Sequence, residues 1–399
     1  MEILDEWKCA LREIGHVWTS PRSLSVQWDA YKKRWAGPDS TKTYRILEER
    51  PWAPRRLTRY MRNPRKAWRA VAPGRWSSTI DIDVPLPSDV VLIPTSHTGL
   101  ICASRQEGIS LKLVPEERFI RREIDAWNVA KQAGIEAHVP TRRDYGSTQN
   151  GMHWMAAQLA PNTRSVGQPF DPTQNRGHKW RRWLRDRILP LLSAFYDASG
   201  VQIESIDDVL DNRKRQLQRD ASLDPLQRVY QLATEAARKG TDTRVATAMV
   251  HGDLHSEHLH CHEEGWWLID WGGARHTNVA IEIFIEYYRC RFREGRVTPF
   301  YNWLSGATPY GRLPRGLRAD IDLYLTWQED WKGIKGDEHS LRATLLCWIL
   351  RRMINRVREK KELRHVLRGT RSANEAALGW YGWVLEELEA LGVRQHTYQ

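Results

Sequence analysis

The chain has 399 residues, 41% of them hydrophobic, which is enough to bury the core of an enzyme-sized globular protein. Its start is acidic where a signal peptide would be cationic, and no run of about 18 apolar residues occurs, so we expect neither a secretory leader nor a membrane span. The five cysteines include no Cys-x-x-Cys pair, which excludes a cysteine-rich zinc module and favours free thiols in a cytoplasmic protein.

Residues 1–80 differ from the rest of the chain in their charge. They hold 17 of the Lys and Arg residues against 8 Asp and Glu, so most of the net charge of +12 lies in the first fifth of the chain. Two stretches in this region, "LDEWKCALREIG" and "SVQWDAYKKRW", have the spacing of helices. We interpret residues 1–80 as a basic, tryptophan-rich N-terminal extension.

The densest basic stretch covers residues 50–76, with nine basic residues and no acid. Its aromatic residues are Trp52, Tyr60, Trp68 and Trp76. Basic side chains spaced between aromatic ones can meet phosphates and stack on bases, so this stretch could contact a nucleic acid. The alternative is a solvated basic arm whose tryptophans dock on the protein body.

Short β-branched runs begin near residue 81. The stretches "STIDIDVPLPSDVVLIP", "GLICAS", "ISLKLV" and "GMHWMAAQLA" predict strands. A helix is expected over residues 115–134, because apolar residues recur at helical spacing between a proline near its start and Gly134 at its end. Residues 81–160 are therefore predicted to form a small strand-rich lobe.

Beyond residue 160 the pattern is mostly helical. Apolar and charged faces alternate at helical period in "HKWRRWLRDRILPLLSAFYDASG", "PLQRVYQLATEAARKG", "SLRATLLCWILRRMINRVREKKEL" and "NEAALGWYGWVLEELEALG". The exception is "HLHCHEEGWWLID", in which two short strands flank a tight turn. We predict a helical lobe over residues 161–399 that contains this hairpin.

Polar residues follow apolar segments on both sides of the hairpin. His251, Gly252 and Asp253 come after "ATAMV", and Asp270 ends "WWLI". Two carboxylates at the ends of hydrophobic segments can converge in one site, where one accepts or orients a hydroxyl proton and the other binds a divalent cation.

The histidine-rich run "HLHCH" also contains typical zinc ligands. Successive residues of a strand point to opposite faces, however, so His258, His260, Cys261 and His262 cannot all face one metal ion. Histidines on the exposed face of a hairpin are the simpler interpretation.

The segment "HGDLHSEH…WWLIDW" resembles the catalytic loop and metal-binding segment of the aminoglycoside phosphotransferase and choline kinase family. The family pattern is His-Gly-Asp followed four residues later by Asn, and then an apolar strand ending in Ile-Asp-Trp or Ile-Asp-Phe. The resemblance covers about residues 88–290 and implies an α+β, bilobal, protein-kinase-like fold, with a small antiparallel sheet in the N-lobe and a mostly helical C-lobe.

The resemblance also implies roles for residues upstream of the hairpin. Lys112 lies on a predicted strand and Glu123 on the next helix, eleven residues later, as the family's Lys–Glu pair requires. The turn with Ser96, His97 and Thr98 precedes Lys112 and fits the position of the nucleotide-covering loop. Gln158 falls where the interlobe hinge would meet the nucleobase.

Within the hairpin region, the resemblance makes Asp253 the base or orienting group for the attacking hydroxyl, with His251 beside it in the catalytic loop. Asp270 would be the main metal ligand, assisted by His258, which replaces the family's Asn. Mg²⁺ prefers oxygen ligands, so this histidine is a departure, although some relatives such as macrolide phosphotransferases also carry it. Glu282 takes the place of an acid that steadies the loop.

These observations predict a phosphotransferase that uses ATP or GTP with Mg²⁺ and phosphorylates a hydroxyl group of a small molecule or a macromolecule. A basic chain is poorly suited to a polycationic antibiotic, so an anionic or macromolecular acceptor is the better expectation. Acids in "RADIDLYLTWQEDW" could line an acceptor site or form a solvated helix face. The alternative is a catalytically impaired kinase fold that binds nucleotide and serves as a module for binding a nucleic acid or a protein partner.

Overall fold

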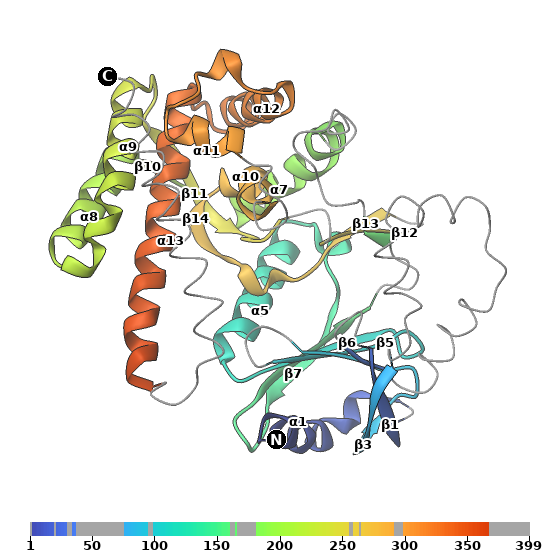
Figure 1. The fold of residues 1–399 in the computed structure, drawn as a ribbon. Helices are drawn as coiled ribbons and strands as arrows, with labels where there is room; N and C mark the ends of the chain where they lie inside the picture. Colours follow the sequence, from blue (N-terminus) through green and yellow to red (C-terminus); the bar gives the residue numbers. More distant parts are fainter. Residues whose placement is uncertain are drawn as a thin grey trace. The chain divides into compact units, whose positions relative to one another are not determined.

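The structure is a computed structural model, which describes residues 2–19, 21–29, 34–36, 76–94, 99–159, 164–165, 181–254, 258–262, 265–290 and 298–366. The chain divides into two compact units, and Figure 1 labels many of their helices and strands. The sheet unit comprises Met1–Ser165 and Leu259–Gly272, and the helical unit comprises Val166–His258 and Gly273–Gln399.

The sheet unit contains an eight-stranded antiparallel sheet with the strand order β3-β1-β2-β4-β5-β6-β8-β7. Its strands are β1 (Arg22–Asp29), β2 (Arg34–Ala36), β3 (Trp76–Leu86), β4 (Val91–Pro94), β5 (Leu100–Ser104), β6 (Ile109–Val114), β7 (Arg142–Ser147) and β8 (His153–Gln158). The other elements described before residue 160 are α1 (Glu2–Glu13), η1 (Gly15–Val17), α5 (Glu117–Gln132) and η2 (Glu136–His138). A small second sheet joins β9 (Arg164–Ser165), β12 (Leu259–His262) and β13 (Gly265–Leu268), and η5 (Trp271–Gly273) follows it.

Alternation along β6 separates two apolar clusters in the sheet unit. Leu111 and Leu113 belong to the larger cluster, to which α1 contributes Leu11. Val114 belongs to the smaller cluster, in which it packs with Ile120 of α5. Because side chains two residues apart share a face of a strand, Lys112 lies on the same face as Val114, the face that meets α5.

Residues before position 80 are part of this sheet. Strand β1 pairs with β2 and β3, and β2 pairs with β4, so the predicted boundary at residue 80 does not coincide with an edge of the sheet. The helix expected over "SVQWDAYKKRW" is wrong, because residues 25–29 and 34–36 are strands. The stretch "SLSVQWD" alternates apolar and polar residues with period two, which favours a strand once paired neighbours are available.

The helix predicted over "LDEWKCALREIG" is confirmed as α1, and polar contacts tie it to the sheet. The backbone N–H of Gln149 donates to Oε2 of Glu13 at 2.8 Å. The amide Nδ2 of Asn150 donates to the carbonyl of Glu6 at 2.9 Å. Both donors lie in the turn between β7 and β8, so α1 is anchored to the same sheet that carries Lys112.

The helical unit contains a three-stranded antiparallel sheet with the order β10-β11-β14. Its strands are β10 (Gln202–Ser205), β11 (Arg244–Val250) and β14 (Arg275–Asn278). The helices and helical turns that the structure describes in this unit are η3 (Leu184–Ile188, a π-helix), α7 (Leu189–Ala198), α8 (Ile206–Gln218), η4 (Ala221–Leu226), α9 (Gln227–Lys239), α10 (Ile281–Cys290), α11 (Thr298–Leu304), η7 (Tyr310–Arg312), α12 (Arg315–Lys332) and α13 (Glu338–Val366).

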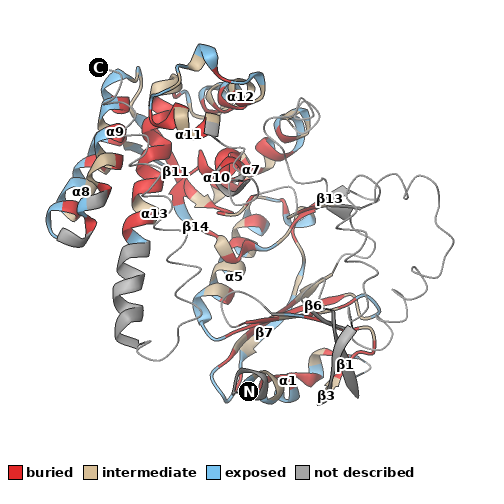
Figure 2. Ribbon diagram, in the orientation of Figure 1, coloured by how far each residue is buried: buried red, intermediate tan, exposed pale blue. Residues whose placement is uncertain are grey.

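Burial in the helical unit is greatest along α10 and the first half of α13, as Figure 2 shows. Strand β11 enters this core, with Val245, Ala246, Ala248 and Val250 buried. His251, Gly252 and Asp253 therefore directly follow a strand that lies in the interior of the unit.

The predicted division into a strand-rich part and a mostly helical part is confirmed, as are the helix over residues 115–134 and the β12–β13 hairpin. The helix expected in "NEAALGWYGWVLEELEALG" and the basic residues 50–75 lie outside the described residues. Within the described part of the chain, no helix is both long enough and apolar enough to cross a membrane.

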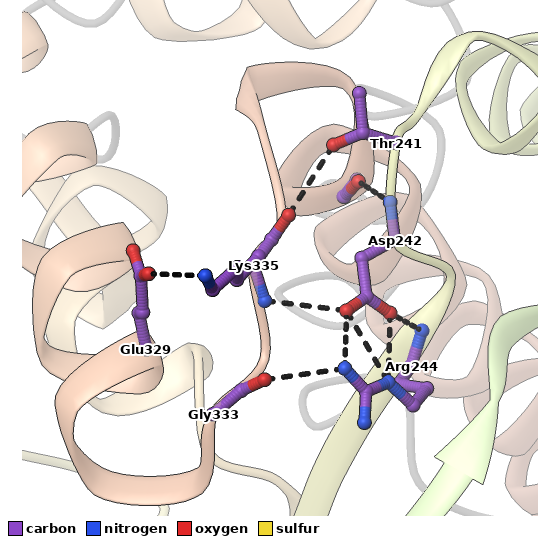
Figure 3. Close-up of polar contacts among 7 residues, drawn as sticks. Thr241, Asp242, Arg244, Glu329, Gly333 and Lys335 are labelled. Carbon is purple, nitrogen blue, oxygen red and sulfur yellow. Dashed lines mark hydrogen bonds and ion pairs between the residues drawn. The ribbon is translucent and has the colours of Figure 1, made fainter.

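Asp242 joins the start of β11 to the loop between α12 and α13, as Figure 3 shows. Its carboxylate accepts from Nη2 of Arg244 at 2.7 Å and from the backbone N–H groups of Arg244 and Lys335 at 3.0 and 3.2 Å. Nη2 of Arg244 also donates to the carbonyl of Gly333 at 3.2 Å. The hydrogen bonds from Arg244 outweigh the effect of partial burial and lower the pKa of Asp242.

Replacing Asp242 by asparagine is expected to lower the free energy of unfolding of the helical unit by about 1–3 kcal/mol at pH 7, because charge-assisted hydrogen bonds are lost. A carboxyl group with a lowered pKa in the folded state stabilises the fold above its unfolded pKa, near 3.9, and this stabilisation is lost as the pH falls through its folded pKa. Denaturant titrations at pH 7 and pH 3 measure the difference, which should shrink at the lower pH. Glu329→Gln is the matched control, since its contact with Lys335 is an exposed pair at 3.6 Å.

Candidate active site

Lys112 of β6 lies between two carboxylates of the sheet unit. Its Nζ donates to Oε1 of Glu123 on α5 and to Oδ1 of Asp270, which is 3.2 Å away. The side chains of Lys112 and Glu123 are 16% and 11% exposed, and that of Asp270 is 46% exposed. The ion pair is therefore shielded, while the Asp270 carboxylate is accessible from solvent.

Burial disfavours the charged form of Lys112, but the carboxylates of Glu123 and Asp270 outweigh burial and raise the pKa of Lys112. The ammonium group therefore stays protonated throughout the physiological pH range. A fixed positive charge can neutralise phosphate groups, and an accessible carboxylate beside it can bind a metal cation together with those phosphates.

Asp270 has a left-handed backbone conformation, with a φ of 62°, and is the one non-glycine residue with positive φ among the described residues. It separates β13 from η5, in which Nε1 of Trp271 donates to the carbonyl of Leu268 at 3.0 Å. A Cβ atom at Gly272 would lie 2.7 Å from Nζ of Lys112 and 3.1 Å from Oε1 of Glu123. A side chain at position 272 would therefore displace the ends of the Lys112 and Glu123 side chains from their present positions.

The residues that are predicted to form the catalytic loop follow β11 in the helical unit. His251 is fully buried, and its Nδ1 accepts from the backbone N–H of Asp253 at 3.2 Å. Gly252 has a φ of 77°, and a Cβ there would lie 2.4 Å from the carbonyl oxygen of Gly273. Only glycine fits this position, so the tight turn fixes the direction in which Asp253 leaves the strand.

His258 closes the same loop. Its Nδ1 lies 2.9 Å from the backbone oxygen of Asp253 and 3.7 Å from Oδ2 of that residue. A carbonyl oxygen only accepts hydrogen bonds, so Nδ1 of His258 is the donor in this contact.

The residues fit a divalent cation that is shared with a nucleotide. Mg²⁺ is usually held by one or two carboxylates together with substrate phosphates, and not by a cage made of protein alone. Asp270 supplies one such carboxylate. Among the residues that the structure describes, no group of three His, Cys, Asp or Glu side chains is placed to hold a metal ion.

Glu282, at the start of α10, forms a hydrogen bond with the loop that contains Asp253. Its Oε1 accepts from the backbone N–H of Gly252 at 2.8 Å, and the residue is 3% exposed. Burial raises the pKa of Glu282 to about 7, although the bond from Gly252 and the charge of Arg275 oppose this shift. Asp253 adds to the increase, because its negative charge disfavours a second anion nearby.

The raised pKa of Glu282 predicts a measurable dependence of stability on pH. The folded state binds a proton more readily than the unfolded state, so stability decreases as the pH rises from 4.5 to about 7. The full difference corresponds to about 3 kcal/mol. In Glu282→Gln this decrease should disappear. The stability of the variant relative to that of wild type should therefore increase as the pH rises. Thermal unfolding at pH 5, 6, 7 and 8 tests this, and parallel curves for the two proteins would contradict it.

The structure thus brings the predicted site residues together in two groups. Lys112, Glu123 and Asp270 are in contact within the sheet unit, whereas His251, Asp253 and His258 are in contact within the helical unit. The remaining predicted residues were assigned to nucleotide binding. Ser96, His97 and Thr98 lie outside the described residues. Gln158 ends β8, pairs with Ile109 and donates its backbone N–H to the carbonyl of Thr141 at 2.8 Å.

The acids of α12 form contacts within the helical unit. Asp320 is buried and accepts from Nε of Arg181 and from the hydroxyl of Tyr287. Asp322 accepts from the hydroxyl of Tyr310. These carboxylates therefore bind neighbouring side chains of the same unit.

Sequence reasoning missed Gly272 as a site residue. The signal was present in the "DWGG" run, because two consecutive glycines close to a predicted metal ligand indicate close approach of the backbone to another group. The identity of that group, the Lys112–Glu123 pair, is visible only in three dimensions.

Comparisons with known proteins show the family to which the chain belongs. The model of the phosphotransferase enzyme family matches residues 110–318, which is more than half of the chain. No curated protein matches the chain. Among solved structures, a choline/ethanolamine kinase family protein from Mesorhizobium loti is 13% identical, with 83% of this chain and 94% of that chain covered and a TM-score of 0.41.

Two further solved structures have a similar degree of likeness. A macrolide 2'-phosphotransferase from Brachybacterium faecium is 13% identical, with 74% of this chain and 88% of that chain covered and a TM-score of 0.40. A thermostable mutant of an aminoglycoside phosphotransferase, in a ternary complex with AMP-PNP and hygromycin B, is 13% identical, with 66% of this chain and 94% of that chain covered and a TM-score of 0.37. The sequence match over residues 110–318 carries the family assignment.

Proposed function

Because the chain belongs to the phosphotransferase enzyme family, we propose that it transfers the γ-phosphate of ATP or GTP to a hydroxyl group of an acceptor. The observation that carries this proposal is the position of Lys112, whose Nζ contacts the carboxylates of both Glu123 and Asp270. Phosphoryl transfer needs a fixed cation for the nucleotide phosphates and a carboxylate for the metal ion, and this cluster contains both groups.

In this proposal Lys112 neutralises the nucleotide phosphates and Glu123 keeps its side chain in place. Ser96, His97 and Thr98 belong to the loop that covers the phosphates. Gln158 belongs to the segment that meets the nucleobase.

Asp270 is the main ligand that we assign to Mg²⁺, with His258 as a second ligand through Nε2. When bound, the cation would neutralise charge on the phosphates during transfer. The acid Asp270 also contacts Lys112, so the same ammonium limits how far its carboxylate can turn.

Asp253 is assigned as the group that orients the acceptor hydroxyl and takes its proton. His251 supports it through the bond from the Asp253 N–H, and Glu282 supports it through the bond from the Gly252 N–H. Catalysis of phosphoryl transfer rests mostly on such positioning, so small shifts of this loop should reduce the rate.

For the acceptor we propose an anionic or macromolecular hydroxyl compound. A polycationic acceptor requires an acidic pocket, yet Asp320 and Asp322 of α12 bind side chains of their own unit. The net charge of +12 favours anionic partners. The basic residues 50–76 would add contacts to a nucleic acid, and this remains a prediction from the sequence alone.

A labelled-nucleotide screen tests the proposal. The full chain is incubated with γ-labelled ATP or GTP, Mg²⁺ or Mn²⁺, and acceptors that include aminoglycosides, macrolides, phosphosugars, oligonucleotides and proteins. We expect transfer to at least one acceptor, or slow hydrolysis, that is lost in Lys112→Met and retained in Lys239→Met. Lys239 is an exposed lysine of α9 and serves as the matched control.

The opposite result would be tight nucleotide binding without turnover under either cation. That outcome would exclude the transferase and favour the alternative of a nucleotide-binding module that no longer transfers phosphate.

A further inference from the structure

A ladder of aromatic rings and cations lies on the surface of the sheet unit between α5 and β7. The guanidinium carbon of Arg142 is 4.8 Å from the ring centre of Trp127 and 4.8 Å from that of Tyr145. Nζ of Lys131 lies 5.7 Å from the ring centre of Trp127. All three distances fall within the range of cation–π attraction, so the four side chains hold one another in place.

This ladder, with the neighbouring Arg143, is accessible and positively charged. Tyr145 is 50% exposed, Lys131 and Arg143 are exposed, and Trp127 and Arg142 are half-buried. Within the described part of the chain, no carboxylate forms an ion pair with Lys131, Arg142 or Arg143. The site of nucleotide chemistry does not use any of these residues, so their three charges are available to an anionic partner.

The backbone of β7 makes a strand-forming peptide a poor partner. β7 is the last strand in the order of the described sheet, so one of its edges has no strand beside it. Its pairing with β8 skips Arg143 between the partners Arg142–Ala157 and Asp144–Ala156. A bulge with a charged residue at a sheet edge interrupts a regular ladder and opposes the addition of another strand.

We propose that this ladder binds single-stranded nucleic acid. Bases would stack on the exposed ring of Tyr145, and phosphates would meet Lys131, Arg142 and Arg143. Alternating aromatic and basic side chains on a surface suit this ligand, because every base has a face that can stack and every nucleotide carries a phosphate. An acidic peptide would contact the basic side chains but would not stack on the ring of Tyr145. This binding site goes beyond the proposed phosphate transfer and does not depend on it.

Binding of a fluorescently labelled oligouridine to the full chain, followed by anisotropy over a range of salt concentrations, tests the proposal. The double change Lys131→Glu and Arg143→Glu should weaken binding at least about tenfold and reduce the salt slope by about 1.4, as expected for two lost phosphate contacts. Tyr145→Ala should weaken binding by about tenfold or more without changing the slope, whereas Tyr145→Phe should retain it. Arg238→Glu, an exposed residue of α9, is the control for charge reversal.

A second measurement separates this ladder from the basic residues 50–76. Oligonucleotides with 4-thiouridine are crosslinked to the full chain, and the modified peptides are identified by mass spectrometry. Crosslinks within residues 127–147 that weaken in Tyr145→Ala support the ladder. Crosslinks confined to residues 50–76 would overturn the proposal. The proposal would also be overturned if polyglutamate competed for binding as strongly as an oligonucleotide of equal charge.

Discussion

Replacing Asp253 by asparagine is expected to lower the rate of phosphate transfer about 10²–10⁴-fold, the usual loss when a positioned proton acceptor is removed. The amide has the shape of the carboxylate but cannot take the hydroxyl proton. The loop contacts of Asp253 through its backbone should persist, because its N–H bonds to His251 and its carbonyl accepts from His258. The loss should therefore come from chemistry and not from a misplaced loop.

The measurement compares kcat and KM for the nucleotide, together with the thermal unfolding temperature, in wild type and Asp253→Asn. We expect a fall in kcat with an unchanged KM for the nucleotide, since Lys112 and Glu123 form their pair without Asp253. Asp211→Asn, in an exposed position on α8, is the control and should behave as wild type. A variant that keeps most of its kcat would show that Asp253 is not the proton acceptor.

Local patterns in the sequence were sufficient for much of the candidate site. The Lys–Glu pair could be predicted because the family resemblance implies a lysine on a strand and a glutamate on the next helix, and Lys112 and Glu123 occupy these positions. The β12–β13 hairpin could also be predicted, since its apolar and polar residues alternate around a turn. Both are short-range features, in which the residues that interact with one another are close in the chain.

Long-range pairing could not be predicted in the same way. Strand β1 acquires its structure from β3, more than fifty residues later, and from β2, which in turn pairs with β4. Its sequence alone is compatible with either a helix or a strand. The positive φ of Asp270 and the close approach of Gly272 to Lys112 likewise depend on a partner that lies about 160 residues earlier in the chain.

Deleting residues 1–80 is expected to unfold the sheet unit and not merely to remove a basic arm. The deletion would take away α1, β1 and β2, together with part of β3. It would also remove Leu11 and Ile14, each 1% exposed, and so expose the rest of the buried cluster to which they belong. Leu11→Ala alone should cost about 2–5 kcal/mol of the free energy of unfolding of this unit, through the loss of buried apolar surface and the cavity that remains. Denaturant titration of Leu11→Ala measures this cost.

A narrower deletion separates the charge of this region from its structural role. Ala36 at the end of β2 pairs with Gln27, and Trp76 at the start of β3 pairs with Asp29, so both ends of the intervening segment are attached to β1. The two ends are separated by two strand spacings, roughly 10 Å, which a flexible linker of about ten residues spans easily. Replacing residues 40–72 by such a linker should therefore leave the unfolding temperature nearly unchanged. If it lowers acceptor affinity and its salt dependence while the fold persists, the basic segment contributes to acceptor binding. If it unfolds the sheet unit as the full deletion does, then the segment itself is needed for the fold, and its charge cannot be assigned to a partner.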